Sequence, residues 1–136
     1  MSYLLDTSAC FAILRNAPKQ VRDRANAALG SGAKLLMSSV ALHELWYGAY
    51  KSEQFQRNIG RLQDFVAGYL QVFEFSEEDA RTAGQLRAEL ESEGKMIDAY
   101  DTLIAAQCLR HSFVLVTTDF SDFRRVKDLR WENWGR

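Results

Sequence analysis

The stretch Tyr3–Ser8, with the sequence Tyr-Leu-Leu-Asp-Thr-Ser, constrains the fold more than any other part of the chain. It is apolar at first and then stops at one acid, Asp6. A short apolar run with polar residues behind it is typical of a central parallel strand, and the sites of open α/β sheets lie just beyond the carboxyl ends of such strands. The stretch therefore predicts a buried strand that delivers Asp6 to a functional site. The alternative is that Asp6 or Ser8 only caps the next helix.

Apolar runs and helical periodicity alternate along the rest of the chain. Further strands are predicted at 34–38, 71–75, 113–117 and 129–134, and helices at 9–14, 18–29, 40–50, 55–69, 76–92 and 98–109. Strands separated by helices predict an α/β fold of three layers, α/β/α, with a central, mostly parallel sheet of about five strands. Trp131 and Trp134 belong to the last strand and are expected at a sheet edge or a subunit contact.

Length and composition predict one globular domain over residues 1–136. No apolar run is long enough to cross a bilayer and no secretory leader is recognisable, so we expect a cytoplasmic protein without a membrane partner. Cys10 and Cys108 lie in apolar helical surroundings, which favours reduced core thiols over a disulfide or a zinc site. The net charge of −1 gives no reason by itself to expect nucleic-acid binding, so any such affinity must come from local patches.

Two further acids stand out by their positions. Asp119 closely follows the strand at 113–117, which repeats the pattern of Asp6. Glu44 lies outside the apolar stripe of its helix and has no basic residue three or four positions away, where an ordinary surface glutamate often finds one. Both positions therefore favour a functional role.

Asp98 and Asp101 stand at the start of one helix. Capping explains Asp98 well. It explains Asp101 less well, because Asp101 heads the stripe that continues through Ile104 and Cys108 into the core. An unpaired carboxylate at the head of a buried stripe is costly, and a divalent cation would neutralise it.

The predicted topology brings Asp6, Asp119, Glu44 and Asp101 to one end of the sheet. Crowded carboxylates repel each other unless a hard cation neutralises them, and oxygen ligands suit Mg²⁺ or Mn²⁺. Such a site is typical of phosphoryl-transfer chemistry, in which the metal activates water and offsets the charge of a phosphodiester.

Other enzyme classes lack their characteristic residues in this sequence. There is no glycine-rich dinucleotide fingerprint and no phosphate-binding P-loop. His43 and His111 are the only histidines that could serve a nucleophile triad. The pair His43-Glu44 does not continue into a zinc-protease motif, because Tyr47 stands where the second histidine belongs.

Four segments carry a family resemblance. They are Leu-Leu-Asp-Thr-Ser at the start, Ser-Ser-Val-x-Leu-x-Glu-Leu-x-Tyr-Gly around Glu44, Ile-x-x-Tyr-Asp-x-Leu-Ile-Ala-Ala around Asp101, and the late Val-Thr-x-Asp with Asp122-Phe123. In this order and spacing, with the closing Leu-x-x-Glu-Asn-Trp, they resemble the VapC-type PIN-domain toxins of type II toxin–antitoxin systems. The resemblance implies a PIN-domain fold and a Mg²⁺-dependent endoribonuclease that cuts structured RNA, most often tRNA in the anticodon stem-loop. It also implies a VapB-type antitoxin and a homodimer that assembles with it into a larger complex.

The resemblance also implies roles for individual residues. Asp6 and Asp101 correspond to the primary metal ligands, and Glu44 and Asp119 complete the acidic cluster directly or through water. A metal-activated water would attack phosphorus and leave a 5′-phosphate. Ser8 stands where many relatives have Asn, and Asp98 where many have Gly, which leaves open whether Asp98 joins the site or only caps its helix. The candidate phosphate contacts are Arg15, Lys19, Arg124 and Arg125.

Two other functions are compatible with parts of the pattern. A haloacid-dehalogenase-like phosphatase would use Asp6 as a covalent nucleophile, but such enzymes have a second acid two residues later, where this chain has Ser8. A non-catalytic PIN-like binding module is the other alternative, although retention of all four acids argues against it.

Overall fold

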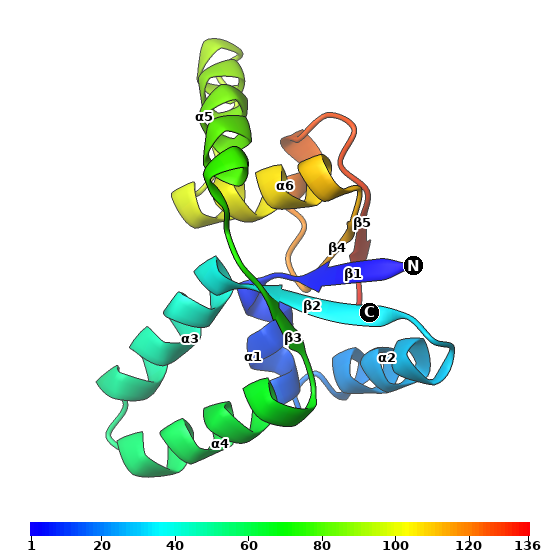
Figure 1. Ribbon diagram of the computed structural model, residues 1–136, viewed down its shortest axis with the longest axis vertical. Helices are drawn as coiled ribbons and strands as arrows, with labels where there is room; N and C mark the ends of the chain where they lie inside the picture. Colours follow the sequence, from blue (N-terminus) through cyan, green and yellow to red (C-terminus); the bar gives the residue numbers. More distant parts are fainter.

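A parallel sheet of five strands forms the centre of the molecule in the computed structural model, which describes residues 1–136 (Figure 1). Its strands are β1 (Ser2–Leu5), β2 (Lys34–Ser38), β3 (Gln71–Phe73), β4 (Val114–Thr117) and β5 (Trp131–Asn133). Their order in the sheet is β3-β2-β1-β4-β5, and every neighbouring pair is parallel. In the central register, Leu5 pairs with Met37 on one side and with Val116 on the other. The predicted mostly parallel sheet is confirmed.

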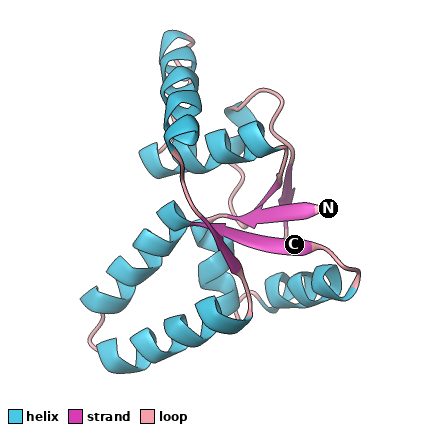
Figure 2. Ribbon diagram, viewed as in Figure 1, coloured by secondary structure: helices cyan, strands magenta, loops and turns pink.

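Helices cover both faces of this sheet. They are α1 (Thr7–Arg15), α2 (Lys19–Gly30), α3 (Ser39–Lys51), α4 (Phe55–Gly68), α5 (Glu77–Ser92) and α6 (Ala99–His111), with a 3₁₀ turn, η1, at Phe123–Arg125. In the view of Figures 1 and 2, α1 to α4 lie below the strands, and α5 and α6 lie above them. This is the expected three-layer arrangement. It follows from right-handed parallel crossovers, because the chain passes from β3 at one edge back across the sheet to β4.

The central strands are apolar because both of their faces are covered. Leu4 and Leu5 in β1 are fully buried, and all four residues of β4 are buried. Cys10 and Cys108 are buried free thiols, as predicted. Trp134 is buried just after the edge strand β5 and its ring lies 5.2 Å from that of Tyr3, which confirms the prediction of a tryptophan at the sheet edge.

Capping residues stand at both ends of α5. Ser76 and Asp79 form the reciprocal capping box at the start of α5, with Asp79 N–H donating to Ser76 Oγ and Ser76 N–H donating to the Asp79 carboxylate. Gly94 follows the helix with φ of 68°, in the left-handed region that glycine enters without strain. None of the helices combines the length and the apolar character that a membrane-spanning helix needs.

Candidate active site

Asp6 lies where β1 passes into α1, at the carboxyl end of the central strand. Its backbone N–H donates to Val116 O at 2.9 Å, so the hydrogen bonding between β1 and β4 extends up to this residue. Its Oδ1 accepts the N–H of Ala9 at 2.8 Å and caps α1. The two interpretations offered by the sequence are therefore compatible, because the same carboxylate caps the helix and lines the pocket described below.

Two hydroxyl groups hold the Asp6 carboxylate in place. Ser8 Oγ donates to Oδ1 at 2.7 Å, and Thr117 Oγ1, from the end of β4, donates to Oδ2 at 2.6 Å. Asp6 is only 4% exposed and has no cationic partner. Burial raises the pKa of this carboxyl to about 6, since the hydrogen bonds from Thr117, Ala9 and Ser8 offset only part of the cost of desolvation, and Glu44 adds repulsion.

Asp101 lies in the first turn of α6, beside two other acids. Asp98 caps this helix by accepting the N–H groups of Tyr100 and Asp101, at 3.0 and 3.2 Å. Asp122 Oδ2 in turn accepts the N–H of Asp98 at 3.2 Å. Partial burial, a hydrogen bond with Asp122, and the charges of Asp6, Asp98 and Asp122 together raise the pKa of Asp101 to about 8. The predicted capping role of Asp98 is confirmed, and its charge also acts on Asp101.

Asp119 is in a different environment. It is exposed in the turn after β4, where its Oδ1 accepts the Ser121 hydroxyl at 2.7 Å and the Ser121 N–H at 3.1 Å. These hydrogen bonds hold the pKa of Asp119 below its ordinary value. Asp119 therefore keeps its negative charge at neutral pH without any metal.

An open pocket of about 300 Å³ joins these acids at the carboxyl end of β1 and β4. No lysine or arginine lines it. Glu44 does not line this pocket but lies next to it in α3, where its Oε1 accepts the Thr7 hydroxyl at 2.7 Å. Sequence reasoning did not assign site roles to Thr7, Thr117 or Asp122. The residues that line the pocket are Asp6, Thr7, Ser8, Phe11, Asp101, Asp119, Ser121 and Asp122.

The donor chemistry of the pocket fits a hard divalent cation. No group of three or more His, Cys, Asp or Glu side chains already stands as a complete ligand set. Mg²⁺ does not need one, because it keeps several water ligands and is usually held by one or two carboxylates. Asp6 and Asp101 are carboxylates without a cationic partner beside one pocket, and a cation there would favour their charged forms.

We predict that the metal-free protein loses stability as the pH rises from about 5 to about 8. Asp6 and Asp101 have folded-state pKa values above the ordinary 3.8, so in this range the folded chain holds protons that the unfolded chain has released. Stability therefore falls as the pH passes through about 6 and about 8. Added Mg²⁺ should raise the melting temperature more at pH 8 than at pH 5. Thermal melts in chelator and in Mg²⁺ measure this, and a flat profile in chelator would contradict it.

Comparison with known proteins agrees with this geometry. The family model described as PIN domain matches residues 3–129. The tRNA(fMet)-specific endonuclease VapC of Shigella flexneri is 36% identical over 135 residues, which cover 99% of each chain. Two solved structures superpose closely, namely VapBC2 from Rickettsia felis bound to a DNA fragment from its promoter and DNA-bound VapBC from Salmonella typhimurium. Their TM-scores are 0.91 and 0.90 and their identities 31% and 33%, with 98% of this chain and 99% and 98% of those chains covered.

The sheet order, the acidic pocket at its carboxyl edge and the match over residues 3–129 define a PIN domain. Relatives that are about 35% identical over almost the whole chain are ribonucleases that carry the name VapC. The chain belongs to the VapC ribonucleases, the PIN-domain toxins of VapBC toxin–antitoxin systems. This family membership favours ribonuclease chemistry over the phosphatase alternative.

Proposed function

We propose that this ribonuclease is a Mg²⁺-dependent endonuclease that cuts tRNA in the anticodon stem-loop and thereby stops translation. The observation that carries the proposal is the pair of carboxylates, Asp6 and Asp101, at one pocket without a cationic partner. The VapC proteins of Shigella flexneri and Salmonella typhimurium, 36% and 33% identical to this chain, are tRNA(fMet)-specific endonucleases, which supports tRNA as the substrate class.

In this proposal Asp6 and Asp101 hold the cation, and Glu44 and Asp119 complete the cluster directly or through water. The bound cation supplies an activated water and offsets the charge of the scissile phosphate. Ser8 and Thr117 orient the Asp6 carboxylate, because each hydroxyl fixes one of its two oxygens. Thr7 does the same for Glu44. The cluster is thus assembled by hydroxyl groups that come from α1 and β4.

No lysine or arginine lines the acidic pocket, so positive charge for the RNA backbone must come from residues outside it. Arg124 is exposed in η1, two residues after Asp122. Arg125 is anchored by donating to Met96 O at 2.9 Å, and the Arg15 guanidinium lies 5.7 Å from the ring centre of Phe11, which lines the pocket. Lys19 is exposed at the start of α2. We propose these four side chains as phosphate contacts.

A VapB-type antitoxin that blocks the site is the proposed partner, and a homodimer that joins it in a larger complex is the proposed assembly. The structures of the Rickettsia felis and Salmonella typhimurium relatives are VapBC complexes bound to DNA, which supports this. The cytoplasm, where translation takes place, is the proposed compartment.

Substitution of Ser8 tests how Asp6 is positioned. Ser8 Oγ donates to Asp6 and also accepts the N–H of Thr118 at 3.1 Å, so it ties α1 to the turn after β4. We expect Ser8→Ala to lower the cleavage rate about 10- to 100-fold, the usual effect of losing a residue that orients a metal ligand. Ser8→Asn keeps a polar group and should retain most activity. Ser31→Ala, at an exposed serine after α2, is the matched control and should cleave at the wild-type rate.

The proposed function is tested by incubating the antitoxin-free protein with total cellular RNA in Mg²⁺ and mapping the cut ends by sequencing. We expect a few discrete cuts, concentrated in tRNA anticodon stem-loops, with 5′-phosphate ends. Cuts confined to ribosomal or messenger RNA would overturn the proposed substrate. The absence of cleavage by folded, metal-loaded protein would overturn the proposed activity.

A further inference from the structure

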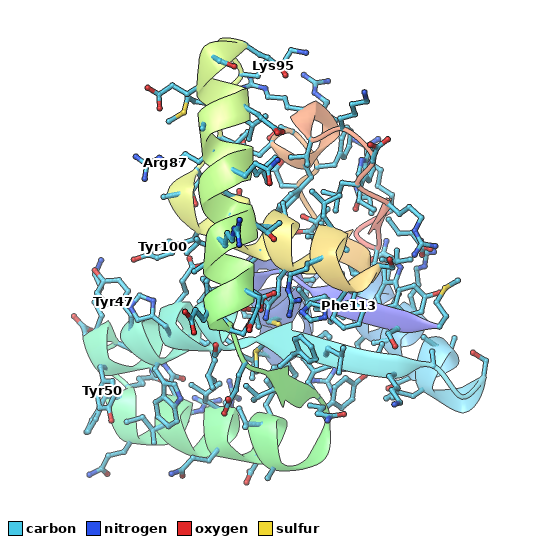
Figure 3. The ribbon with its side chains drawn as sticks, turned by 45° about the horizontal axis from the view of Figure 1, so that its top comes forward. Tyr47, Tyr50, Arg87, Lys95, Tyr100 and Phe113 are labelled. Carbon is cyan, nitrogen blue, oxygen red and sulfur yellow. The ribbon has the colours of Figure 1, made fainter.

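Two exposed aromatic side chains lie beside the acidic pocket. Tyr47 is 61% exposed in α3 and Tyr100 is 41% exposed at the start of α6. Both belong to the segments around Glu44 and Asp101 that carry the site acids. Figure 3 shows them along one edge of the molecule, where they project outward from two different helices. Exposed apolar groups that gather in one patch, rather than singly, mark interaction sites.

A second open pocket, of about 530 Å³, lies between these two helices. We call it the aromatic pocket. It adjoins the acidic pocket, since Phe11 lines both and Glu44 accepts the hydroxyl of Thr7, which lines the acidic one. Its volume falls within the range of about 300 to 1,000 Å³ that is usual for small-molecule sites. Its main lining residues are Phe11, His43, Glu44, Tyr47, Lys51 and Tyr100.

The arrangement of these side chains suits a nucleotide. Tyr100 directly precedes Asp101 in the sequence. Its ring lies 5.6 Å from that of His43 at an interplanar angle of 55°, so the two rings are tilted and do not stack on each other. Lys51 Nζ lies 5.6 Å from the ring centre of Tyr47. Along α3 the order is Glu44, Tyr47, Lys51, which places an aromatic ring and then a cation progressively farther from the acids.

We propose that the aromatic pocket holds an unpaired nucleobase of the RNA, next to the phosphate that is cut at the acidic pocket. Aromatic rings bind bases of any sequence by stacking, but only when the base is free of a duplex. Lys51 is placed to contact the neighbouring backbone phosphate. The pocket therefore selects for single-stranded loops in structured RNA. This inference rests on the proposed function, because it assigns the nucleotide next to the scissile bond.

The test compares Tyr47→Ala, Tyr100→Ala and Tyr100→Phe on two synthetic RNA probes, a hairpin with an unpaired loop and a fully paired duplex. Fluorescence anisotropy in chelator measures binding without cleavage, and initial rates in Mg²⁺ measure KM and kcat. We expect each alanine variant to weaken hairpin binding and to raise KM about 5- to 100-fold, the loss typical of one stacked base. The phenylalanine variant should stay within about threefold of wild type, because it keeps the ring. Duplex binding should be weak in wild type and unchanged in every variant.

Tyr50→Ala is the matched control. Tyr50 is 64% exposed on the same helix but packs against Trp46 and Phe55 and does not line the aromatic pocket, so its variant should bind the hairpin as wild type does. Wild-type binding by both alanine variants, with cleavage intact, would overturn this inference and leave the proposed function standing. Loss of antitoxin inhibition with unchanged RNA binding would also overturn it, because the surface would then serve a protein. If the wild-type protein cuts no RNA at all, the proposed function fails and this inference fails with it.

Discussion

Asp6→Asn is expected to lower the rate of RNA cleavage at least about a hundredfold while the protein stays folded, because the cation that activates water loses its buried carboxylate. Asn keeps an oxygen that can accept the Ala9 N–H and the Ser8 hydroxyl, so the helix cap survives. Thr117 Oγ1 already lies 2.9 Å from Asp119 O and can donate there instead. The substitution therefore removes charge with little change of shape.

This prediction separates catalysis from stability. At pH 8 a buried, unneutralised charge disappears, so metal-free Asp6→Asn should melt at the wild-type temperature or above it, while the stabilisation by Mg²⁺ should shrink sharply. Cleavage assays and paired melts in chelator and Mg²⁺ measure both quantities. Asp23→Asn, at an exposed acid on α2, is the control and should leave both unchanged. A variant that cleaves within about threefold of wild type would exclude Asp6 from the metal site.

Asp79→Ala is expected to destabilise the fold by about 2 to 4 kcal/mol. Asp79 is fully buried and belongs to the capping box of α5. Its Oδ1 also accepts a hydrogen bond from Arg110 Nε at 2.7 Å and lies 3.0 Å from His111 Nε2. These two contacts link α5 to the end of α6. The substitution removes one of the two hydrogen bonds of the capping box and leaves two basic groups without their partner. Both are partly exposed, so water replaces some of the lost interaction.

The lowered pKa of Asp79 makes its contribution to the stability of the fold depend on pH. Burial raises this pKa, but hydrogen bonds from Ser76, Arg110 and His111 outweigh burial and hold the pKa below its ordinary value. The stabilisation is therefore present above about pH 4 and is lost as the pH falls below it. Urea unfolding at pH 7 and pH 3 measures the free energy of unfolding of wild type and Asp79→Ala. The difference between the two proteins should be smaller at pH 3. The control, Glu78→Ala, removes an exposed neighbour and should cost less than about 0.5 kcal/mol. A urea midpoint of Asp79→Ala at pH 7 equal to that of wild type would contradict this prediction.

Local sequence patterns predicted the elements of this fold and much of its site. The apolar run before Asp6 predicted β1, and the position of Asp101 at the head of a buried stripe predicted an acid in need of a partner. In the structure Asp6, Asp101 and Asp119 line one pocket, while Glu44 lies beside it and reaches it through Thr7. The ligand roles of these four acids stay predictions.

Contacts between distant segments were beyond sequence reasoning. The Ser-x-x-Asp spacing of Ser76 and Asp79 is a local pattern of a capping box. The pairing of Asp79 with Arg110 and His111 leaves no such pattern, because these residues lie more than 30 positions away. His111 stands out in the sequence only as one of two histidines, and the structure places the Asp79 carboxylate beside it. Asp122 was noted only within a motif. Its short spacing after Asp119 could have suggested a further acid at the same pocket.

If the acidic pocket cuts RNA only with a bound divalent cation, cleavage must follow a titration with Mg²⁺. Chelator-treated protein would be mixed with purified tRNA, Mg²⁺ added in steps, and the rate and the chemistry of the new ends recorded. We predict no cleavage in chelator, a rate that saturates with Mg²⁺, and 5′-phosphate ends. Cleavage at the same rate in chelator, or 5′-hydroxyl ends with cyclic phosphates, would contradict this expectation.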